Sequence, residues 1–357
     1  MTGTATKTML LAVGGNSLIR AGQKGTIAEQ LANARRTAAE VAKLVGDGYR
    51  VVLTHGNGPQ VGAALLRSER GASQVPGLPL DVCDASTQGE IGYVLQQSLD
   101  TELRLAGLRV PLHPVKPKPG LTGAPAVVTV LTQVVVSLDD PAMKRPSKPI
   151  GPFYSRADAE ERKRLLNWEI VEDAARGYRR VVPSPEPQDI IELEVIRDLM
   201  ERNVLVIACG GGGIPVAWRE GRLQGVEAVI DKDRASALLA SRLGVDLFVI
   251  STDTDYVYLD YKKPAQRPLH LVGCSELQEY AEGGHFPPGN MGPKVESVLR
   301  FLMQGGREAI ITSCENLYAA VSGPVGTHIV PNRVELDRGE GALDARVHTE
   351  LPVGGRS

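Results

Sequence analysis

The chain has 357 residues, enough for one large domain or two ordinary ones, and a formal net charge of −2 at pH 7. Charged residues make up 23% of the sequence and aromatic residues 4%. This balance argues against a nucleic-acid partner, which would need clustered Lys and Arg or a platform of stacking aromatics.

The N-terminal stretch MTGTATKTMLLAVGGN has one lysine and lacks the long apolar region of a signal peptide. No apolar run reaches membrane-spanning length. The cysteines show no CxxC or metal-ligand spacing, and they stand far apart at Cys83, Cys209, Cys274 and Cys314. We therefore expect reduced, structural thiols in a cytoplasmic protein without a membrane partner.

In chain order, short apolar runs alternate with glycine-rich turns and amphipathic helices. A capping box formed by Thr26 and Glu29 marks one helix start. Strands are expected over 8–13, 49–53, 204–208, 246–251 and 309–312, and helices over 27–45, 63–69, 91–106, 190–201, 233–243 and 294–303. This alternation predicts an α/β fold with a largely parallel sheet covered on both faces. Ligands of such sheets gather at the carboxyl ends of the strands.

Residues 137–180 interrupt this pattern. They are rich in Pro, Lys, Arg, Asp and Glu, and their first part has no strand pattern. We expect a small inserted subdomain with a core of Phe153, Tyr154, Leu165 and Leu166; the alternative is a disordered linker. The stretch HPVKPKPGLTGAP, residues 113–125, is typical of an extended surface loop. VVPSPEPQDI, residues 181–190, is equally compatible with a rigid hinge and with ligand contact.

Three glycine-rich turns follow strands at equivalent places: AVGGNS, THGNGPQVG and CGGGGIPV. Glycine lets backbone approach a ligand closely, and the N–H groups of the next helix start favour an anion. Any one of them could be only a tight strand-to-helix turn, but three together indicate an anion site. No Gly-Lys-Ser/Thr follows, and neither of the first two turns fits the dinucleotide pattern GxGxxG.

Lysines that could neutralise such an anion lie near other turns. Lys232 stands at a helix start in VIDKDRAS, where Asp231 or Asp233 could cap the helix. Lys294 follows the glycine loop of GNMGPKVES, and Lys148 lies in RPSKPIGPFYS of the inserted segment. Each alone could be a solvated surface charge, but together they resemble a clamp for a transferring phosphoryl group.

Two further features leave alternatives open. Asp253, Asp255 and Asp260 could bind Mg²⁺, although Mg²⁺ that accompanies nucleotides often takes most ligands from phosphate and water, so the metal ligands stay unassigned. His55 could be a general base, but a histidine satisfied by backbone hydrogen bonds is the favoured interpretation.

These motifs resemble those of the carbamate kinases within the amino acid kinase family. The resemblance runs from Leu10 to about residue 330 and includes AVGGNSL, THGNGPQVG, DVCDASTQGEIGYVLQQ, VLTQVVV, RPSKPIGPFYS, RRVVPSPEPQDIIE, ACGGGGIPV, GVEAVIDKDRASALLA, GNMGPKVE and AIITSCENL. The segment SKPIGPFYS separates carbamate kinases from aspartate, glutamate and uridylate kinases of the same fold.

The resemblance implies one amino acid kinase domain over 1–357, folded as a three-layer α/β/α sandwich around a mainly parallel sheet. It implies a protruding lid subdomain over 137–180 and a homodimer, and it gives no role to the tail over 333–357. The implied reaction is reversible phosphoryl transfer between ATP, with Mg²⁺, and carbamate, used for ATP synthesis in arginine and carbamoyl phosphate catabolism.

The resemblance also implies roles for individual residues. The expected catalytic residues are Lys148, Lys232, Asp233 and Lys294. The residues expected to hold carbamate and the phosphoryl group are Gly14, Gly15, Asn16, Gly56, Asn57, Gly58, Gly210, Gly211, Gly212 and Gly213. The residues expected at the nucleotide are Lys232, Ser251, Asp253, Tyr256, Met291 and Lys294.

This sequence departs from the family at the pair before Asp255, where Asp253 and Thr254 replace small hydrophobic residues. The extra charge leaves open a family enzyme that acts on another small acid or amide. A non-catalytic nucleotide-binding regulator is a third possibility, which the retention of all three lysines disfavours.

Overall fold

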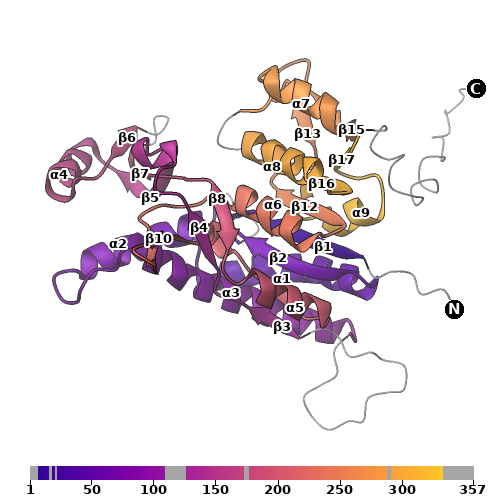
Figure 1. The fold of residues 1–357 in the computed structure, drawn as a ribbon, viewed down its shortest axis with the longest axis horizontal. Helices are drawn as coiled ribbons and strands as arrows, with labels where there is room; N and C mark the ends of the chain where they lie inside the picture. The colour runs from indigo at the N-terminus through magenta and orange to yellow at the C-terminus, as the bar shows by residue number, and fades with distance from the viewer. Residues whose placement is uncertain are drawn as a thin grey trace, which may run out of the picture.

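The structure is a computed structural model, and it describes residues 7–15, 18–20, 22–108, 126–172, 177–287 and 291–332. The expected loop over 113–125 and the tail over 333–357 lie outside the described residues, as does Asn16. Figure 1 shows a layered body from which one small subdomain stands out.

The centre of the body is an eight-stranded sheet with the order β15-β17-β16-β12-β1-β2-β9-β3. In chain order its strands are β1 (Thr8–Val13), β2 (Arg50–His55), β3 (Val127–Thr129), β9 (Leu205–Ile207), β12 (Leu247–Thr252), β15 (Leu271–Gly273), β16 (Glu308–Ser313) and β17 (Thr327–Val330). The six strands from β16 to β3 are parallel, and β17 pairs with β16 in the antiparallel sense. The expectation of a mainly parallel sheet is confirmed.

The helices of the described residues are α1 (Ile27–Gly46), α2 (Gly58–Gly71), α3 (Leu80–Leu105), α4 (Arg156–Leu166), α5 (Leu193–Glu201), α6 (Lys232–Leu243), α7 (Cys274–Glu282), α8 (Met291–Met303) and α9 (Leu317–Ser322). Helices α1, α3 and α9 cover one face of this sheet and α5, α6, α7 and α8 the other, whereas α4 belongs to the protruding subdomain. The capping box of Thr26 and Glu29 starts α1 as expected.

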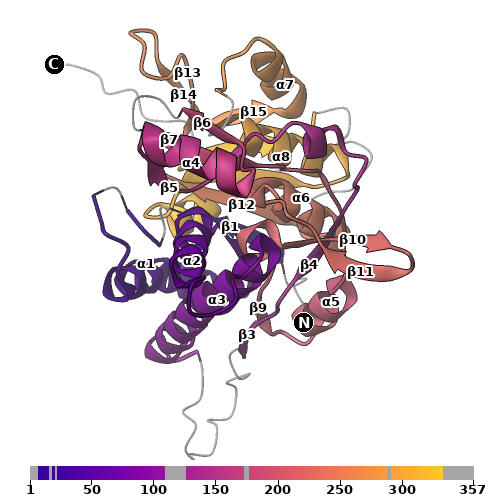
Figure 2. The same ribbon diagram turned by 90° about the vertical axis from the view of Figure 1, so that its left-hand side faces the viewer.

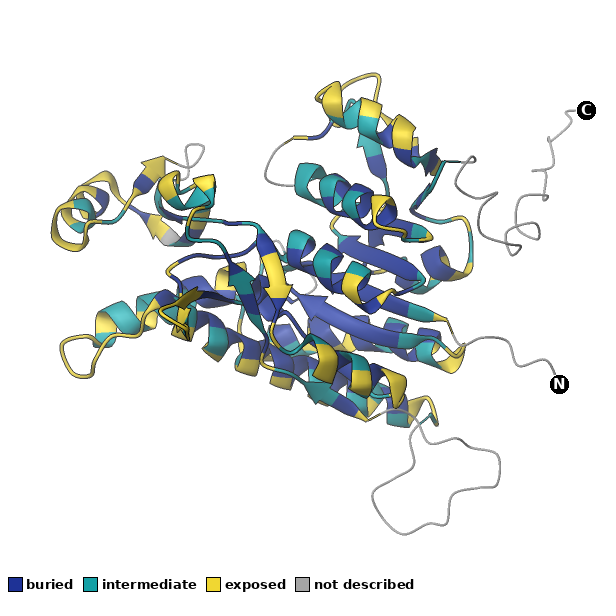
Figure 3. Ribbon diagram, in the orientation of Figure 1, coloured by how far each residue is buried: buried dark blue, intermediate teal, exposed yellow. Residues whose placement is uncertain are grey.

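The alternation of side chains along β1 creates two cores. Met9 and Leu11 pack with apolar residues of α1, α3 and α9, whereas Leu10 and Ala12 pack with those of α5, α6, α7 and α8. All four residues are fully buried, and Figure 3 shows the central strands as the most buried part of the molecule. The structure is therefore the expected three-layer α/β/α sandwich.

Two smaller sheets and two turns of 3₁₀ helix lie outside the central sheet. One sheet has the order β11-β10-β4-β8, and the other is a hairpin of β13 and β14. Their strands are β4 (Gln133–Val136), β8 (Pro187–Ile190), β10 (Ile214–Arg219), β11 (Arg222–Gly225), β13 (Val257–Leu259) and β14 (Arg267–Leu269), and the 3₁₀ helices are η2 (Pro141–Lys144) and η3 (Gly210–Gly212). The helix expected over 190–201 is therefore wrong at its start, because residue 190 ends β8.

The protruding subdomain contains α4 and a three-stranded sheet ordered β5-β7-β6, with β5 (Lys148–Tyr154), β6 (Ile170–Glu172) and β7 (Tyr178–Val182). The expectation that its first part forms no strand is wrong. Prolines and Gly151, whose φ is +74°, disguise β5 in the sequence, and its register with β7 shifts between Ile150 and Tyr154.

The small core of the subdomain also differs from the expected one. Tyr154, Ala159 and Ile170 form it, with Trp168 and Tyr178 packed against them. Phe153, Leu165 and Leu166 are exposed instead. Figure 2 shows α4 standing out beside α2, and the ion pair between Arg162 and Glu69, 2.9 Å long, joins these two helices.

Candidate active site

The glycine turns after β1 and β2 lie side by side, because these strands are parallel neighbours with Val13 opposite His55. A Cβ atom at Gly56 would lie 3.5 Å from the Gly15 backbone nitrogen and 3.3 Å from Lys232 Cδ. Gly14 lies so close to β12 that a Cβ atom there would be 2.8 Å from the Ser251 carbonyl oxygen. The carboxyl ends of β1, β2 and β12 thus meet the first residue of α6.

Asp233 brings two of the expected lysines together. Lys232 Nζ lies 2.7 Å from Asp233 Oδ1, and Lys294 Nζ lies 3.1 Å from Asp233 Oδ2. Lys232 is the first residue of α6 and Lys294 lies in the first turn of α8, so two helix starts converge on one carboxylate. The Asp233 side chain is 4% exposed, and the two lysine side chains are 14% and 11% exposed.

The electrostatics of this triad follow from burial and proximity. Burial alone raises the pKa of Asp233, but the ammonium groups of Lys232 and Lys294 hold it far below its usual range. Burial lowers the pKa of Lys232; the Asp233 carboxylate opposes that effect, and the ammonium of Lys294 adds to it. The triad contains two ammonium groups and one carboxylate, and this balance favours a bound anion.

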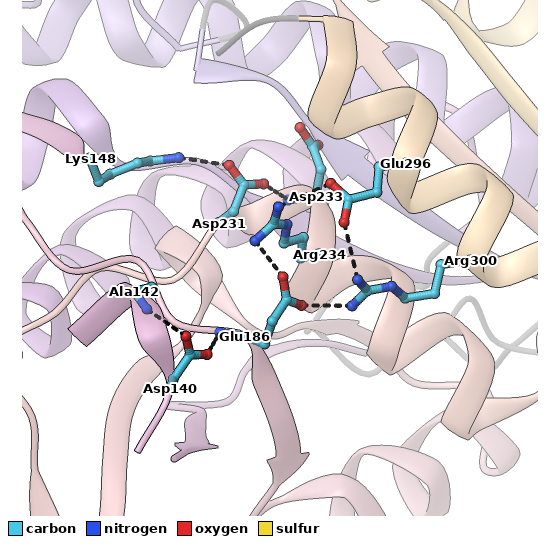
Figure 4. A network of polar contacts seen from close by, with 9 residues as sticks. All are labelled: Asp140, Ala142, Lys148, Glu186, Asp231, Asp233, Arg234, Glu296 and Arg300. Carbon is cyan, nitrogen blue, oxygen red and sulfur yellow. Dashed lines mark hydrogen bonds and ion pairs between the residues drawn. The ribbon is translucent and has the colours of Figure 1, made fainter. Parts of the chain in front are cut away.

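The third expected lysine reaches the same helix start from the subdomain. Lys148 Nζ lies 2.7 Å from Asp231 Oδ2 (Figure 4). Asp231 also caps α6, because its Oδ1 accepts a hydrogen bond from the Asp233 backbone N–H at 2.9 Å. Burial raises the pKa of Asp231, but Lys148 outweighs it and holds the pKa below its usual value. The sequence suggested Asp231 only as a helix cap, and its pairing with Lys148 was missed.

A ring of ion pairs anchors the chain where it returns from the subdomain. Glu186, which precedes β8, pairs with Arg234 of α6 and with Arg300 of α8, the latter at 2.7 Å. Glu296 closes the ring through Arg234 at 3.0 Å and Arg300 at 3.1 Å (Figure 4). The Asp140 carboxylate accepts from the Glu186 N–H at 2.8 Å, so the two ends of the insertion are joined. The proline segment thus anchors the insertion to the helices that carry the lysines.

The four glycines of CGGGGIPV lie beneath the turn after β2. Three of them have positive φ, and each packs against another part of the protein. A Cβ atom at Gly210 would lie 2.5 Å from His55 Nε2, and one at Gly211 would lie 2.2 Å from Asn57 Nδ2. Gln88 Nε2 donates to the Gly210 carbonyl oxygen at 3.0 Å. The run therefore supports the turn that carries His55 and Asn57.

His55 is fully buried, with Nδ1 3.1 Å from the Gly56 carbonyl oxygen. A carbonyl only accepts, so Nδ1 carries the proton. Burial lowers the pKa of His55 to about 4, although the Gly56 contact opposes that effect. The imidazole is neutral at pH 7, and the backbone satisfies only Nδ1, because the buried Nε2 has no hydrogen-bond partner among the described residues.

Besides Lys232 and Lys294, the residues expected at the nucleotide are spread over three segments. Ser251 is buried at the end of β12 beside Gly14, and Met291 begins α8. Asp253 and Tyr256 lie between β12 and β13, where the Tyr256 ring meets His270 edge-on at 4.8 Å. Lys232 and Lys294 are thus the two expected nucleotide residues that the structure brings to one carboxylate.

The acidic stretch after β12 does not form a metal cluster. Asp255 accepts from Asn316 at 2.9 Å, and Asp260 pairs with Lys263 at 3.1 Å. Over the part of the chain that the structure describes, no three His, Cys, Asp or Glu residues are grouped as metal ligands. In the same part, no helix is both long and apolar enough to cross a bilayer.

The comparisons with known proteins agree with this geometry. A model of the amino acid kinase family matches residues 7–313. The carbamate kinase of Thermococcus kodakarensis is 45% identical over 327 residues, which cover 91% of this chain and 99% of the relative. Carbamate kinase 1 of Enterococcus faecium is 45% identical over 325 residues, which cover 90% and 98%. The Giardia lamblia carbamate kinase bound to AMP-PNP superposes with a TM-score of 0.83 at 40% identity, covering 92% of this chain and 99% of that one.

Proposed function

The chain belongs to the amino acid kinase family, and from that membership we propose that it is a carbamate kinase, which transfers a phosphoryl group reversibly between ATP and carbamate. Relatives with that name are 45% identical to it over nearly their full length. The observation that carries the proposal is the Asp233 carboxylate shared by Lys232 and Lys294.

This arrangement suits phosphoryl transfer. The transferring group carries negative charge on three oxygens, and catalysis depends mainly on positioning and charge neutralisation. Lys232 and Lys294 supply fixed positive charge, and Lys148 adds a third ammonium group from the subdomain. Asp233 orients the first two lysines, since both of its oxygens are engaged by them.

The carbamate oxygen is already anionic, so the reaction needs no strong general base. The neutral His55 is consistent with that chemistry, because its proton is held on the nitrogen that faces the Gly56 carbonyl. Carbamate is too small to bury much surface, and its affinity must come from a few convergent polar groups. We assign the substrate site to Gly14, Gly15, Asn16, Gly56, Asn57 and Gly58, with Gly210, Gly211, Gly212 and Gly213 as the layer that supports it.

The nucleotide is assigned to the loops after β12 and before α8, with Ser251, Asp253, Tyr256 and Met291 as contacts beside Lys232 and Lys294. Mg²⁺ belongs to the nucleotide substrate and takes most of its ligands from phosphate and water. Asp233 suits the orientation of lysines better than the binding of metal, since both oxygens already hold ammonium groups.

The insertion over 137–180 is assigned as a lid that carries Lys148 to the site. Closure of a lid excludes water, and carbamoyl phosphate is labile in water.

We further propose that the enzyme is a cytoplasmic homodimer that makes ATP in arginine and carbamoyl phosphate catabolism. We propose that the edge strand β3, with the exposed Tyr93 and Leu131 beside it, provides the surface for self-association.

A coupled assay tests the proposal by following ATP formation from ADP and carbamoyl phosphate in the presence of Mg²⁺. We expect turnover that saturates in both substrates. The absence of turnover in the wild-type enzyme would exclude the proposal in favour of another small acid substrate or a non-catalytic nucleotide-binding role.

A further inference from the structure

The Asn57 side chain is held by two residues of α3 that the reaction as described does not use. Asn57 stands between β2 and α2 and is 3% exposed. Its amide nitrogen donates to Asp84 Oδ1 at 2.7 Å and to Thr87 Oγ1 at 2.8 Å. Both amide hydrogens are therefore used, and the nitrogen faces α3.

The hydroxyl of Thr87 fixes which way round the amide lies. Thr87 Oγ1 donates its single hydrogen to the Asp84 backbone carbonyl oxygen at 2.8 Å. It can then only accept from Asn57, so a flipped amide would place oxygen against oxygen. The Asn57 side-chain oxygen must point away from α3.

Gly211 closes one face of the amide. A Cβ atom at Gly211 would lie 2.2 Å from Asn57 Nδ2 and 2.7 Å from Oδ1. Among the described residues no hydrogen bond reaches Oδ1. This oxygen also differs from Asp84 Oδ2 and His55 Nε2, which are sealed from solvent without a partner in the described structure. Asn57 Oδ1 is therefore an unused hydrogen-bond acceptor among the described residues.

The backbone that precedes Asn57 lies near Lys232. Asn57 follows Gly56, and a Cβ atom at Gly56 would lie 3.3 Å from Lys232 Cδ. A phosphoryl group at the lysines therefore leaves the rest of a small acyl phosphate near Asn57. Of the two ends of carbamate, only the amino group donates hydrogen bonds, and it needs an acceptor.

We propose that Asp84 and Thr87 are positioning residues that present the Asn57 oxygen to the amino group of the substrate and so determine selectivity for a carbamoyl group. This inference rests on the proposed function. A methyl group in place of the amino group leaves the Asn57 oxygen unpaired, and sites built around such a hydrogen bond discriminate strongly against analogues that lack it. Acetyl phosphate is that analogue.

The test compares kcat/KM for ATP formation from ADP with carbamoyl phosphate and with acetyl phosphate. We expect the wild-type enzyme to favour carbamoyl phosphate by about 100-fold or more. Asp84→Ala and Thr87→Val should lower this ratio by about 10-fold or more, because the amide can then rotate. Asp84→Asn and Thr87→Ser keep an acceptor for Asn57 and should retain most of the selectivity.

Ser98→Ala is the matched control. Ser98 is a buried residue of α3 whose hydroxyl donates to the Val94 carbonyl oxygen at 2.8 Å. Its loss should leave the selectivity ratio unchanged.

The inference would be overturned if Asp84→Ala and Thr87→Val lost the same fraction of their rate with both substrates, so that the selectivity ratio stayed unchanged. That outcome would leave the proposed function intact. If Asp84→Ala does not fold, the comparison of Thr87→Val with Thr87→Ser decides. A different result would exclude the proposed function itself, namely a wild-type enzyme that makes no ATP from ADP and carbamoyl phosphate.

Discussion

Lys148 Nζ lies 2.7 Å from Asp231 Oδ2, and this ion pair joins the protruding subdomain to the N-cap of α6. The other oxygen of Asp231 accepts from the Asp233 backbone N–H. One carboxylate therefore caps the helix that begins with Lys232 and also positions the lysine supplied by the subdomain. Rearrangement of the subdomain must break this pair or move with α6.

Asp231→Asn separates the two roles, because asparagine caps a helix about as well as aspartate but carries no charge. We expect kcat to fall by about 10-fold, since Lys148 is no longer held in place, while the melting temperature stays near that of the wild-type protein. Lys148→Ala should lower kcat by about 100-fold, the typical loss of one transition-state donor. Steady-state kinetics and thermal melting measure both effects.

Lys163→Ala is the control for these variants. Lys163 lies on α4 of the same subdomain and pairs with Glu160 at 3.3 Å, with 38% of its side chain exposed. Its loss should change neither kcat nor melting temperature. A wild-type kcat in Asp231→Asn would mean that the ion pair has no part in positioning Lys148.

The triad of Lys232, Asp233 and Lys294 should behave as a unit. Each single replacement by alanine should lower kcat by about 100-fold or more. The two lysines stabilise the negative charge that develops on the phosphoryl group during its transfer, and Asp233 orients both lysines. The double variant Lys232→Ala/Lys294→Ala should lose less than the product of the single effects, since groups that act together are not additive. Rapid-quench measurement of single turnovers separates this effect from product release. Unchanged rates in the two single lysine variants, Lys232→Ala and Lys294→Ala, would show that the site is wrongly assigned.

Much of this arrangement could be predicted from the sequence. Lys148, Lys232 and Lys294 could be singled out because a lysine at a helix start or a glycine turn is unusual without an anion, and the structure brings two of them to Asp233 and the third to Asp231. The sheet could be predicted because apolar runs such as Thr8–Val13 alternate with helical periodicity, and that pattern is local.

The long-range pairings could not be predicted. Asp231 and Lys148 are 83 positions apart, and Asn57 and Asp84 are 27 apart. Nothing in the spacing indicates such partners, because they depend on how the elements pack. The strand β5 was missed for a different reason: its prolines and Gly151 obscure the alternation that marks a strand.

Asp84 should make the stability of the protein depend on pH. Burial raises the pKa of Asp84 to about 7 from an ordinary value of 3.8, against the hydrogen bond from Asn57. Between these two pH values the folded state binds more protons than the unfolded state, so the free energy of unfolding falls as pH rises. Asp84→Asn removes this dependence. From pH 5 to pH 8 the variant should gain about 2–3 kcal/mol relative to the wild-type protein, at 1.36 kcal/mol per pKa unit.

Urea unfolding at the two pH values measures this difference. The exposed Glu161 of α4 provides the control, and Glu161→Gln should keep the pH dependence of the wild-type protein. If Asp84→Asn and wild-type protein lose stability in parallel from pH 5 to pH 8, the Asp84 carboxyl is not held protonated in the folded state.

Gly211 should tolerate no side chain, because a Cβ atom there would collide with the Asn57 amide. Its φ is +71°, and a Cβ atom would lie 2.2 Å from Asn57 Nδ2, so Gly211→Ala must displace the Asn57 amide. Gly221 has nearly the same φ, +73°, but a Cβ atom there meets nothing within 4 Å. Gly221→Ala should therefore cost only the backbone strain, about 1 kcal/mol, and leave kcat unchanged. Gly211→Ala should cost about 2 kcal/mol or more and lower kcat even though all three lysines are intact. Denaturant unfolding and steady-state kinetics of the two variants test this, and equal effects in both would show that contact with Asn57 is unimportant.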